Sequence, residues 1–230
     1  MFPAQLYDFQ FYQKKKDILL YRAKDHARNY FLKSIIAKDD AVRQAFYDEY
    51  ESLSQLVSPS LPIYYGIEDN FRYPDQEGSY LTLCMEDCSD RQPLSMEDYS
   101  IPELLKILHK TGKTLLYLLS QGILYTDLNP SNILIDENLE VTLLDFTYCY
   151  YFLRNPRPAY PLRFSYNLTP SLKGHQLLIQ ELALLLQQMI MEKEEISLSS
   201  SVCLLLETGL HPSETLLLPD YLVLIEKALV

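Results

Sequence analysis

Three residues with oxygen-bearing side chains bracket two short apolar runs in the middle of the chain. Asp127 and Asn132 precede or begin the run NILID, and Asp145 ends the run VTLLD. Both runs favour β-strand, and the polar segment ENLE between them favours a turn. The two ends of an antiparallel hairpin lie side by side. We therefore expect Asn132 beside Asp145, with Asp127 on the loop that leads into the hairpin.

Oxygen ligands in this arrangement suit one kind of chemistry. A carboxylate with an amide oxygen suits Mg²⁺, a hard cation that keeps several waters and takes phosphate oxygens. A second carboxylate nearby can accept a hydroxyl proton or orient a nucleophile. Such parts suffice for phosphoryl transfer, in which positioning and charge neutralisation do most of the work. Any one of these residues alone is commonly a turn former or a helix cap, so the prediction depends on the set.

The elements that precede this hairpin indicate a small sheet. Over the first ~85 residues we predict one helix, 39–57, whose apolar residues follow helical spacing and which Asp39 or Asp40 can cap. The remaining segments alternate apolar and polar residues as strands do. The predicted strands are 5–12, 17–23, 29–36, IYYGIED and SYLTLCMED.

The rest of the chain has a helical character. The segment 101–122 predicts a long helix that ends near Gly122, and 175–190 is apolar on most faces and predicts a core helix. Two further apolar segments lie around 196–206 and 214–229. The chain thus predicts a sheet-rich part followed by a larger helical part.

Composition excludes several classes of protein. A net charge of −11 argues against a general nucleic-acid binder, because phosphate backbones require clustered Lys and Arg. Four scattered cysteines are too few for a disulfide scaffold, and free thiols suit a reducing cytoplasm. With no signal peptide and no run of about 18 apolar residues, we expect a cytoplasmic protein without a membrane span. The last residues, IEKALV, are still helical in pattern, as in a piece of a longer protein.

The stretch TDLNPSNIL followed by LLDF resembles the catalytic loop and the metal loop of the eukaryotic-like protein kinase superfamily. The resemblance implies that Asp127 is the catalytic base and that Asn132 and Asp145 bind the metal. It also implies ATP and Mg²⁺ as cofactors. It covers most of the chain, from residue 5 to about residue 192.

The resemblance extends toward the N-terminus. It implies that Lys33, in NYFLK, binds the α- and β-phosphates and that a helix glutamate orients it. Glu49 is the expected partner, and Glu51 is the alternative, which would face about 200° away on the helix. The backbone groups of Glu86 and Cys88 would bind adenine.

The fold that this resemblance implies is a single α+β domain of two lobes. We expect a five-stranded N-lobe over residues 1–86 and a mainly helical C-lobe over residues 87–230. Together they would form a minimal protein-kinase-like domain.

Two departures concern the phosphates and the metal loop. The glycine-rich phosphate loop is missing, and the first glycine in the chain is Gly66. In its place stands QKKKD, whose Lys14, Lys15 and Lys16 could attract phosphates by charge or could simply form a solvated turn. Thr147 replaces the glycine of Asp-Phe-Gly, which we expect to stiffen that turn and fix one orientation.

Other departures concern regulation and substrate. Tyr125 and Thr126 replace the His-Arg pair of the catalytic loop, so the usual partner of an activation-loop phosphate is lost and we expect no activation by that route. Asn129 stands where Ser/Thr kinases have a lysine, which points to slower turnover or another substrate. DLNPSN also resembles the loop of small-molecule and sugar kinases. The Ala-Pro-Glu motif is not visible, and the segment in its place carries three arginines that could hold an anionic substrate or an acidic partner, or be scattered loop charges: Arg154, Arg157 and Arg163.

Three functions stay open at this point. The first is an ATP- and Mg²⁺-dependent phosphotransferase, a divergent serine/threonine protein kinase. The second is a pseudokinase-type scaffold with weak or no nucleotide binding, which the missing motifs favour. The third is a small-molecule hydroxyl kinase on the same fold. Retention of an acidic cluster whose mutual repulsion calls for a cation favours the enzyme. Expected partners are a nucleotide, a protein or small-molecule substrate that bears a hydroxyl, and a protein partner on the C-lobe.

Overall fold

The structure, a computed structural model, describes residues 2–15, 17–36, 40–147, 149–151, 172–193 and 198–229. The chain divides into two compact units, Met1–Asp90 and Arg91–Val230. The lobe limits predicted above, 1–86 and 87–230, stay a prediction. Expectations that concern five residues fall outside the described residues: Lys16, Asp39, Arg154, Arg157 and Arg163.

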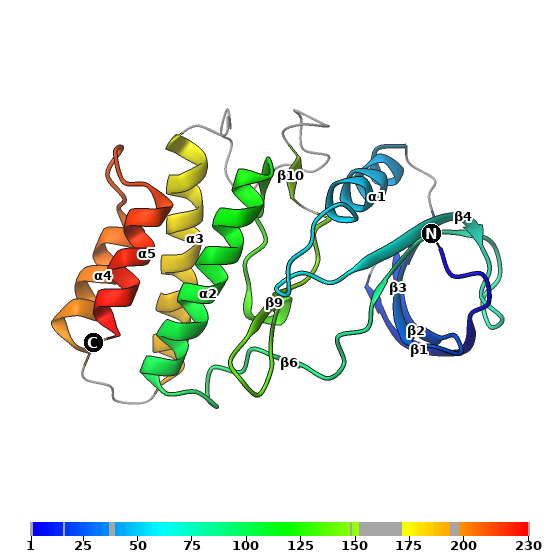
Figure 1. Ribbon diagram of the computed structural model, residues 1–230, viewed down its shortest axis with the longest axis horizontal. Helices are drawn as coiled ribbons and strands as arrows, with labels where there is room; N and C mark the ends of the chain where they lie inside the picture. Colours follow the sequence, from blue (N-terminus) through cyan, green and yellow to red (C-terminus); the bar gives the residue numbers. More distant parts are fainter. Residues whose placement is uncertain are drawn as a thin grey trace. The chain divides into compact units, whose positions relative to one another are not determined.

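The described part of the first unit forms a five-stranded antiparallel sheet with one helix (Figure 1). Its strand order is β1-β2-β3-β5-β4, and helix α1 (Asp40–Leu53) contacts β4 and β5. The five predicted strands and the predicted helix are therefore confirmed. The strands are β1 (Tyr7–Lys15), β2 (Ile18–Lys24), β3 (Asn29–Ile35), β4 (Tyr64–Phe71) and β5 (Tyr80–Glu86).

The two faces of this sheet have different surroundings. On β2, Leu19 and Tyr21 are buried in an aromatic core, in which the ring of Tyr21 stacks on that of Tyr73 with centroids 4.0 Å apart. Successive strand residues point to opposite faces. Tyr30 and Leu32 of β3 belong to that core, so Phe31 and Lys33 lie on the opposite face. Alternation along β3 thus places Lys33 away from the aromatic core.

The hairpin between β1 and β2 differs from the prediction. Strand β1 was predicted to end at residue 12, but it continues to Lys15, and Lys15 pairs with Ile18. Lys14 and Lys15 are exposed strand residues rather than part of a loop. Their polarity suggested a loop, but β1 is an edge strand, where exposed lysines are common.

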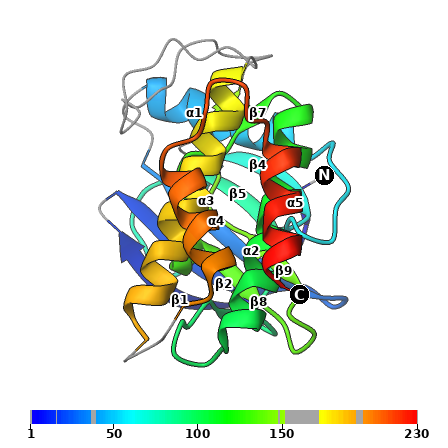
Figure 2. The same ribbon diagram turned by 90° about the vertical axis from the view of Figure 1, so that its left-hand side faces the viewer.

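Four helices dominate the described residues of the second unit, and Figures 1 and 2 show them side by side. Helix α2 contacts α3 and α5, and α4 contacts the same two helices. Ser100 and Glu103 cap the start of α2, where the Ser100 N–H donates to the Glu103 carboxylate at 2.8 Å. No helix within the described residues is long and apolar enough to cross a membrane. The helices are α2 (Ile101–Ser120), α3 (Leu172–Met191), α4 (Ser200–Leu210) and α5 (Leu218–Ala228).

Short strands in the second unit carry the predicted hairpin. Strand β8 (Ile133–Ile135) pairs antiparallel with β9 (Val141–Leu143), and β6 (Gln92–Pro93) joins on the other side of β8. Strand β7 (Ile123–Leu124) pairs with β10 (Tyr150–Tyr151). The hairpin predicted between Asn132 and Asp145 is confirmed. Its strands are shorter than predicted, because a 3₁₀ turn η1 (Pro130–Asn132) precedes them and Asp145 leaves the extended conformation.

Candidate functional site

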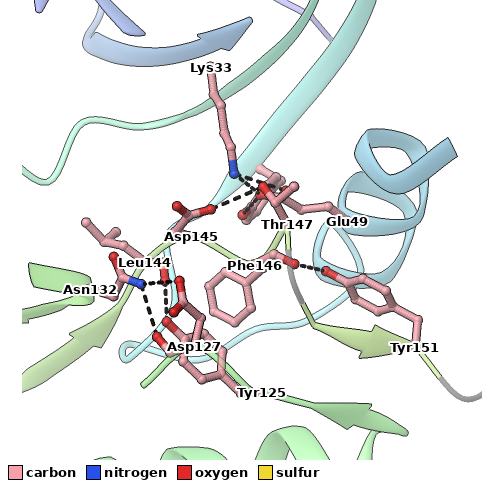
Figure 3. A network of polar contacts seen from close by, with 11 residues as sticks. Lys33, Glu49, Tyr125, Asp127, Asn132, Leu144, Asp145, Phe146, Thr147 and Tyr151 are labelled. Atoms are coloured by element: carbon pink, nitrogen blue, oxygen red, sulfur yellow. Dashed lines mark hydrogen bonds and ion pairs between the residues drawn. The ribbon is translucent and has the colours of Figure 1, made fainter. Parts of the chain in front are cut away.

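The first unit holds a buried ion pair. The Lys33 Nζ lies 3.2 Å from Glu49 Oε2 and 3.4 Å from Oε1 (Figure 3). Lys33 comes from β3 and Glu49 from α1, and the two residues are only 5% and 0% exposed. Of the two glutamates considered from the sequence, Glu49 contacts the lysine, whereas Glu51 is exposed. Helix phase separates the two, since residues two apart differ by about 200° around the axis.

Two aromatic residues support this ion pair. The Tyr64 hydroxyl, at the start of β4, donates to Glu49 Oε1 at 2.8 Å. The Lys33 Nζ also lies over the ring of Phe46, 5.6 Å from its centroid. Breaking a buried ion pair by removing one partner leaves an uncompensated charge. Lys33 and Glu49 are therefore held as a unit by side chains from three elements, β3, α1 and β4.

The segment that follows β5 carries the residues expected to bind adenine. Glu86 forms two hydrogen bonds with Ile63: its N–H donates to the Ile63 carbonyl at 2.8 Å, and its carboxylate accepts the Ile63 N–H at 3.1 Å. Cys88 is buried, and its thiol lies 3.9 Å from the Glu86 carbonyl oxygen. The structure thus fixes the course of the chain from Glu86 to Cys88 at the end of the sheet.

In the second unit, Asp127 and Asn132 are in direct contact. The Asn132 Nδ2 donates to the backbone carbonyl and to Oδ2 of Asp127, both at 3.1 Å (Figure 3). The Asn129 Nδ2 donates to the same carbonyl, also at 3.1 Å. The bond to Oδ2 restrains the Asp127 carboxylate, and the two bonds to the carbonyl hold the backbone of the loop. They also direct Nδ2 of Asn132 toward Asp127, so Oδ1 is the atom through which Asn132 can bind a cation.

The hairpin brings Asn132 next to the residue before Asp145. The Leu144 N–H donates to the Asn132 carbonyl at 2.8 Å, and the Tyr125 hydroxyl donates to the Leu144 carbonyl at 2.6 Å. Tyr125 is 1% exposed, and burial raises its pKa well above the ordinary value. Its hydroxyl therefore stays a proton donor, and it links the loop of Asp127 to the loop of Asp145.

The loop around Asp145 is held at each of its residues. Asp145 has a φ of +57°, a conformation that residues other than glycine seldom adopt. The Thr147 hydroxyl donates to Asp145 Oδ1 at 3.1 Å, and the Tyr151 hydroxyl donates to the Phe146 carbonyl at 2.8 Å. The ring of Phe146 meets the ring of Tyr125 edge-on, with centroids 5.2 Å apart. The loop therefore has specific partners for both its backbone and its side chains.

The oxygen donors of the second unit suit Mg²⁺, which needs few protein ligands, better than a metal ion bound by protein ligands alone. The described residues contain no group of three or more His, Cys, Asp or Glu that could hold a metal ion. Asp145 and Asn132 offer one carboxylate and one amide oxygen. Mg²⁺ is commonly bound by one or two carboxylates together with water and substrate phosphates. These two residues fit a cation that arrives with a phosphate ligand.

Sequence reasoning missed the tyrosines that position these side chains. Tyr125 was interpreted as the loss of a histidine, although its ring and its hydroxyl donor make specific contacts. Tyr64 and Tyr151 were not singled out at all. The only available signal was the place of Tyr125 directly before the catalytic loop, since the partners of Tyr64 and Tyr125 lie 15 and 19 residues away in the chain.

Comparisons with known proteins bear on the family of the chain. The family model described as the protein kinase domain matches residues 17–164, which is more than half of the chain. The serine/threonine-protein kinase PknD of Chlamydia pneumoniae is 31% identical over 119 residues, which are 48% of this chain and 13% of that protein. The serine/threonine-protein kinase RUNKEL of Arabidopsis thaliana is 37% identical over 75 residues, which are 31% of this chain and 6% of that protein.

The chain matches only a small part of the length of these curated relatives, so their names describe much longer proteins. The family match includes the strand of Lys33, the helix of Glu49 and the loops of Asp127 and Asp145. The α+β fold, with its five-stranded antiparallel sheet and its helical second unit, agrees with that match. The chain belongs to the protein kinase family.

Proposed function

We propose that this chain is an ATP- and Mg²⁺-dependent protein kinase that transfers a phosphoryl group to a serine or threonine hydroxyl. The observation that carries the proposal is the buried Lys33–Glu49 ion pair with its Tyr64 donor. Burying two charges costs free energy that a well-packed apolar pair would not cost. A lysine held in this way in a protein kinase domain is explained by a need to bind phosphate.

The first unit supplies nucleotide contacts in this proposal. Lys33 binds the α- and β-phosphates, and Glu49 orients its ammonium group. The backbone of Glu86 and Cys88 binds the base through hydrogen bonds. The two hydrogen bonds between Glu86 and Ile63 support this role, because they hold that backbone in place before a base arrives.

The second unit supplies the groups for transfer. Asp145 and Asn132 hold Mg²⁺, which neutralises the phosphate charge when it is bound. Asp127 orients the acceptor hydroxyl and takes its proton. The hydrogen bond from Asn132 to Oδ2 supports this role, since it restrains the Asp127 carboxylate.

A scaffold that binds nucleotide weakly is the second candidate, and Phe31 favours it. The family pattern Val-Ala-Ile-Lys has alanine two residues before the lysine, and this chain has Phe31. Residues two apart on a strand share a face, so the Phe31 ring lies on the Lys33 side of the sheet. There it also meets the ring of Tyr12, with ring centroids 5.7 Å apart. A bulky ring there takes up space beside the phosphate-binding lysine. A small-molecule hydroxyl kinase stays a third prediction.

Thermal unfolding with nucleotide distinguishes the enzyme from the scaffold. Wild type is measured with ATP and Mg²⁺, with ATP and EDTA, and alone, and Asp145→Asn is measured in parallel. A ligand at 100 times its Kd stabilises the folded state by about 2.7 kcal/mol. We expect a rise in melting temperature that requires Mg²⁺ and is lost in Asp145→Asn. No rise at millimolar ATP would favour the scaffold.

The acceptor is tested by ADP formation. Wild type is given ATP and Mg²⁺ with a serine/threonine peptide library, or with a mixture of sugars and other small hydroxyl compounds. Asp127→Asn serves as the control, because it removes the proton acceptor and keeps the size of the side chain. ADP formed only with peptides supports a protein kinase, and ADP formed only with the small compounds supports the third prediction.

A further inference from the structure

Helix α1, which carries Glu49, is attached to β4 at a second place. The Arg43 Nη2 donates to Asp69 Oδ1 at 2.8 Å, and the Tyr47 hydroxyl donates to Asp69 Oδ2 at 2.5 Å. A single strand carboxylate thus holds two successive turns of the helix. Sequence reasoning and the protein kinase family pattern used above give Asp69 no role.

The backbone at Asp69 is shaped to present this carboxylate. Glu68 pairs with Thr82 and Phe71 pairs with Tyr80, so two residues of β4 lie opposite one residue of β5. This arrangement is a β-bulge, which re-aims side chains out of the regular strand pattern. Asn70, within the bulge, has a φ of +62°. The left-handed conformation costs a residue other than glycine conformational energy, and it persists where the surrounding structure fixes it.

The two attachments fix the rotation of α1. Arg43 and Tyr47 are one helical turn apart and lie on the same side. Glu49 follows Tyr47 by two residues, or about 200°, and so lies on the other side, where Tyr64 donates to it. Tyr64 and Asp69 both belong to β4. A rotation that withdraws Glu49 from Lys33 would therefore break hydrogen bonds on both sides of the helix.

We propose that Asp69 is a positioning residue that holds α1 in the rotation at which Glu49 meets Lys33. Its role in catalysis rests on the proposed function, whereas its effect on the ion pair does not. Helix α1 then keeps Glu49 on Lys33 through contacts inside the first unit, without a bound activator. The hydrogen bond to Asp69 raises the pKa of Tyr47, so this phenol remains protonated and keeps donating.

Chemical labelling of Lys33 tests the effect on the ion pair without nucleotide. Amine acetylation is followed by mass spectrometry, with the exposed Lys113 as the internal reference. Asp69→Ala is expected to raise the acetylation rate of Lys33 about three- to tenfold, a modest factor because the contact is partly exposed. Glu49→Gln is the positive control. Glu68→Gln, an exposed carboxylate on the same strand, is the matched control and keeps the wild-type rate.

The acetylation rate of Lys33 can also contradict the proposed role of Asp69. If Asp69→Ala leaves the acetylation rate of Lys33 unchanged while Glu49→Gln raises it, the proposal is wrong. Should Asp69→Ala fail to fold, Tyr47→Phe combined with Arg43→Gln removes the same contacts and keeps the carboxylate. That double variant is expected to raise the rate in the same way, and an unchanged rate would overturn the proposal.

Kinetics separate positioning from a loss of stability. If only a fraction of Asp69→Ala molecules holds Glu49 on Lys33, the apparent affinity for ATP falls by that fraction. The KM for ATP then rises about three- to tenfold, and kcat at saturating ATP stays near wild type. Partial unfolding would instead lower kcat and leave KM unchanged. Failure of the proposed function is distinguishable, since a wild type without ATP turnover leaves the labelling result intact.

Discussion

The hydroxyl of Tyr125 provides a sharp test of how the loop of Asp127 and the loop of Asp145 are held together. The substitution Tyr125→Phe removes only the hydroxyl that donates to the Leu144 carbonyl at 2.6 Å. The ring, and its edge-on contact with Phe146 at 5.2 Å, is kept. The change therefore removes the hydroxyl's hydrogen bond to Leu144 and its interaction with the Asn132 side chain, and it keeps the ring.

The magnitude follows from the burial of the pair. Tyr125 is 1% exposed, and Leu144 is half-buried, so the carbonyl regains water only in part. Leaving a buried acceptor without its donor lowers the free energy of unfolding by about 1–3 kcal/mol. Because the Leu144 carbonyl is partly exposed, we expect the lower part of this range, about 1–2 kcal/mol. At about 2–4 °C per kcal/mol for a chain of this length, the melting temperature falls by roughly 2–8 °C.

The measurement is thermal unfolding followed by near-ultraviolet circular dichroism, with and without ATP and Mg²⁺. Tyr117→Phe is the matched control, because Tyr117 is half-buried on α2 and its hydroxyl makes no hydrogen bond within the described part of the chain. Loosening of the Asp145 loop is expected to weaken Mg-ATP binding by at most about thirtyfold, the factor that 2 kcal/mol represents. A Tyr125→Phe protein that melts and binds like wild type would refute the reasoning.

Two further predictions concern Phe31 beside Lys33 and His109 in the helical unit. Phe31→Ala is expected to tighten ATP binding roughly fivefold, because it relieves about 1 kcal/mol of crowding beside Lys33. Isothermal titration calorimetry measures the Kd for ATP. Weaker binding by the variant would show that the Phe31 ring supports the nucleotide instead. Burial lowers the pKa of His109 in the folded state, so the unfolded chain binds more protons and stability is lost as the pH falls below about 6.5. The melting temperature of His109→Asn should therefore fall less than that of wild type between pH 7.5 and pH 5.5. Equal falls would show that His109 does not cause the loss of stability.

Local patterns were enough to predict the hairpin and the loop before it. The hairpin strands lie close together in sequence, and Asn132 reaches Leu144 through one short turn. Apolar runs, a polar turn and the period of two therefore specify the pairing without long-range information. The same holds for the long helices, whose apolar spacing extends over several turns.

The pairing of Lys33 with Glu49 needed the family resemblance. The two residues come from a strand and a helix that are 16 positions apart, and no local pattern links them. Helix phase then distinguished Glu49 from Glu51, because the helix itself was predicted well enough to fix which residue faces inward. The end of β1 was mispredicted, since Lys14 and Lys15 look like a turn but lie in an edge strand.

The supporting contacts were beyond sequence reasoning. Asp69 acts from a bulge whose only trace in the sequence is an asparagine at position 70, and asparagine has many other uses. Tyr64 and Tyr125 donate to partners that only the tertiary structure brings near. Residues of these types are common in this chain, which contains 19 tyrosines, so type alone does not mark the ones that position the site.

Transfer of the γ-phosphate tests the central claim most directly. Wild type and Asp127→Asn are incubated with γ-³²P-labelled ATP and Mg²⁺, with the serine/threonine peptide library as acceptor, and incorporated label is counted. We predict label on serine or threonine with wild type, and its loss in Asp127→Asn even though that variant still binds ATP. Equal label with both proteins, or none with wild type under conditions in which ATP is bound, would contradict the account.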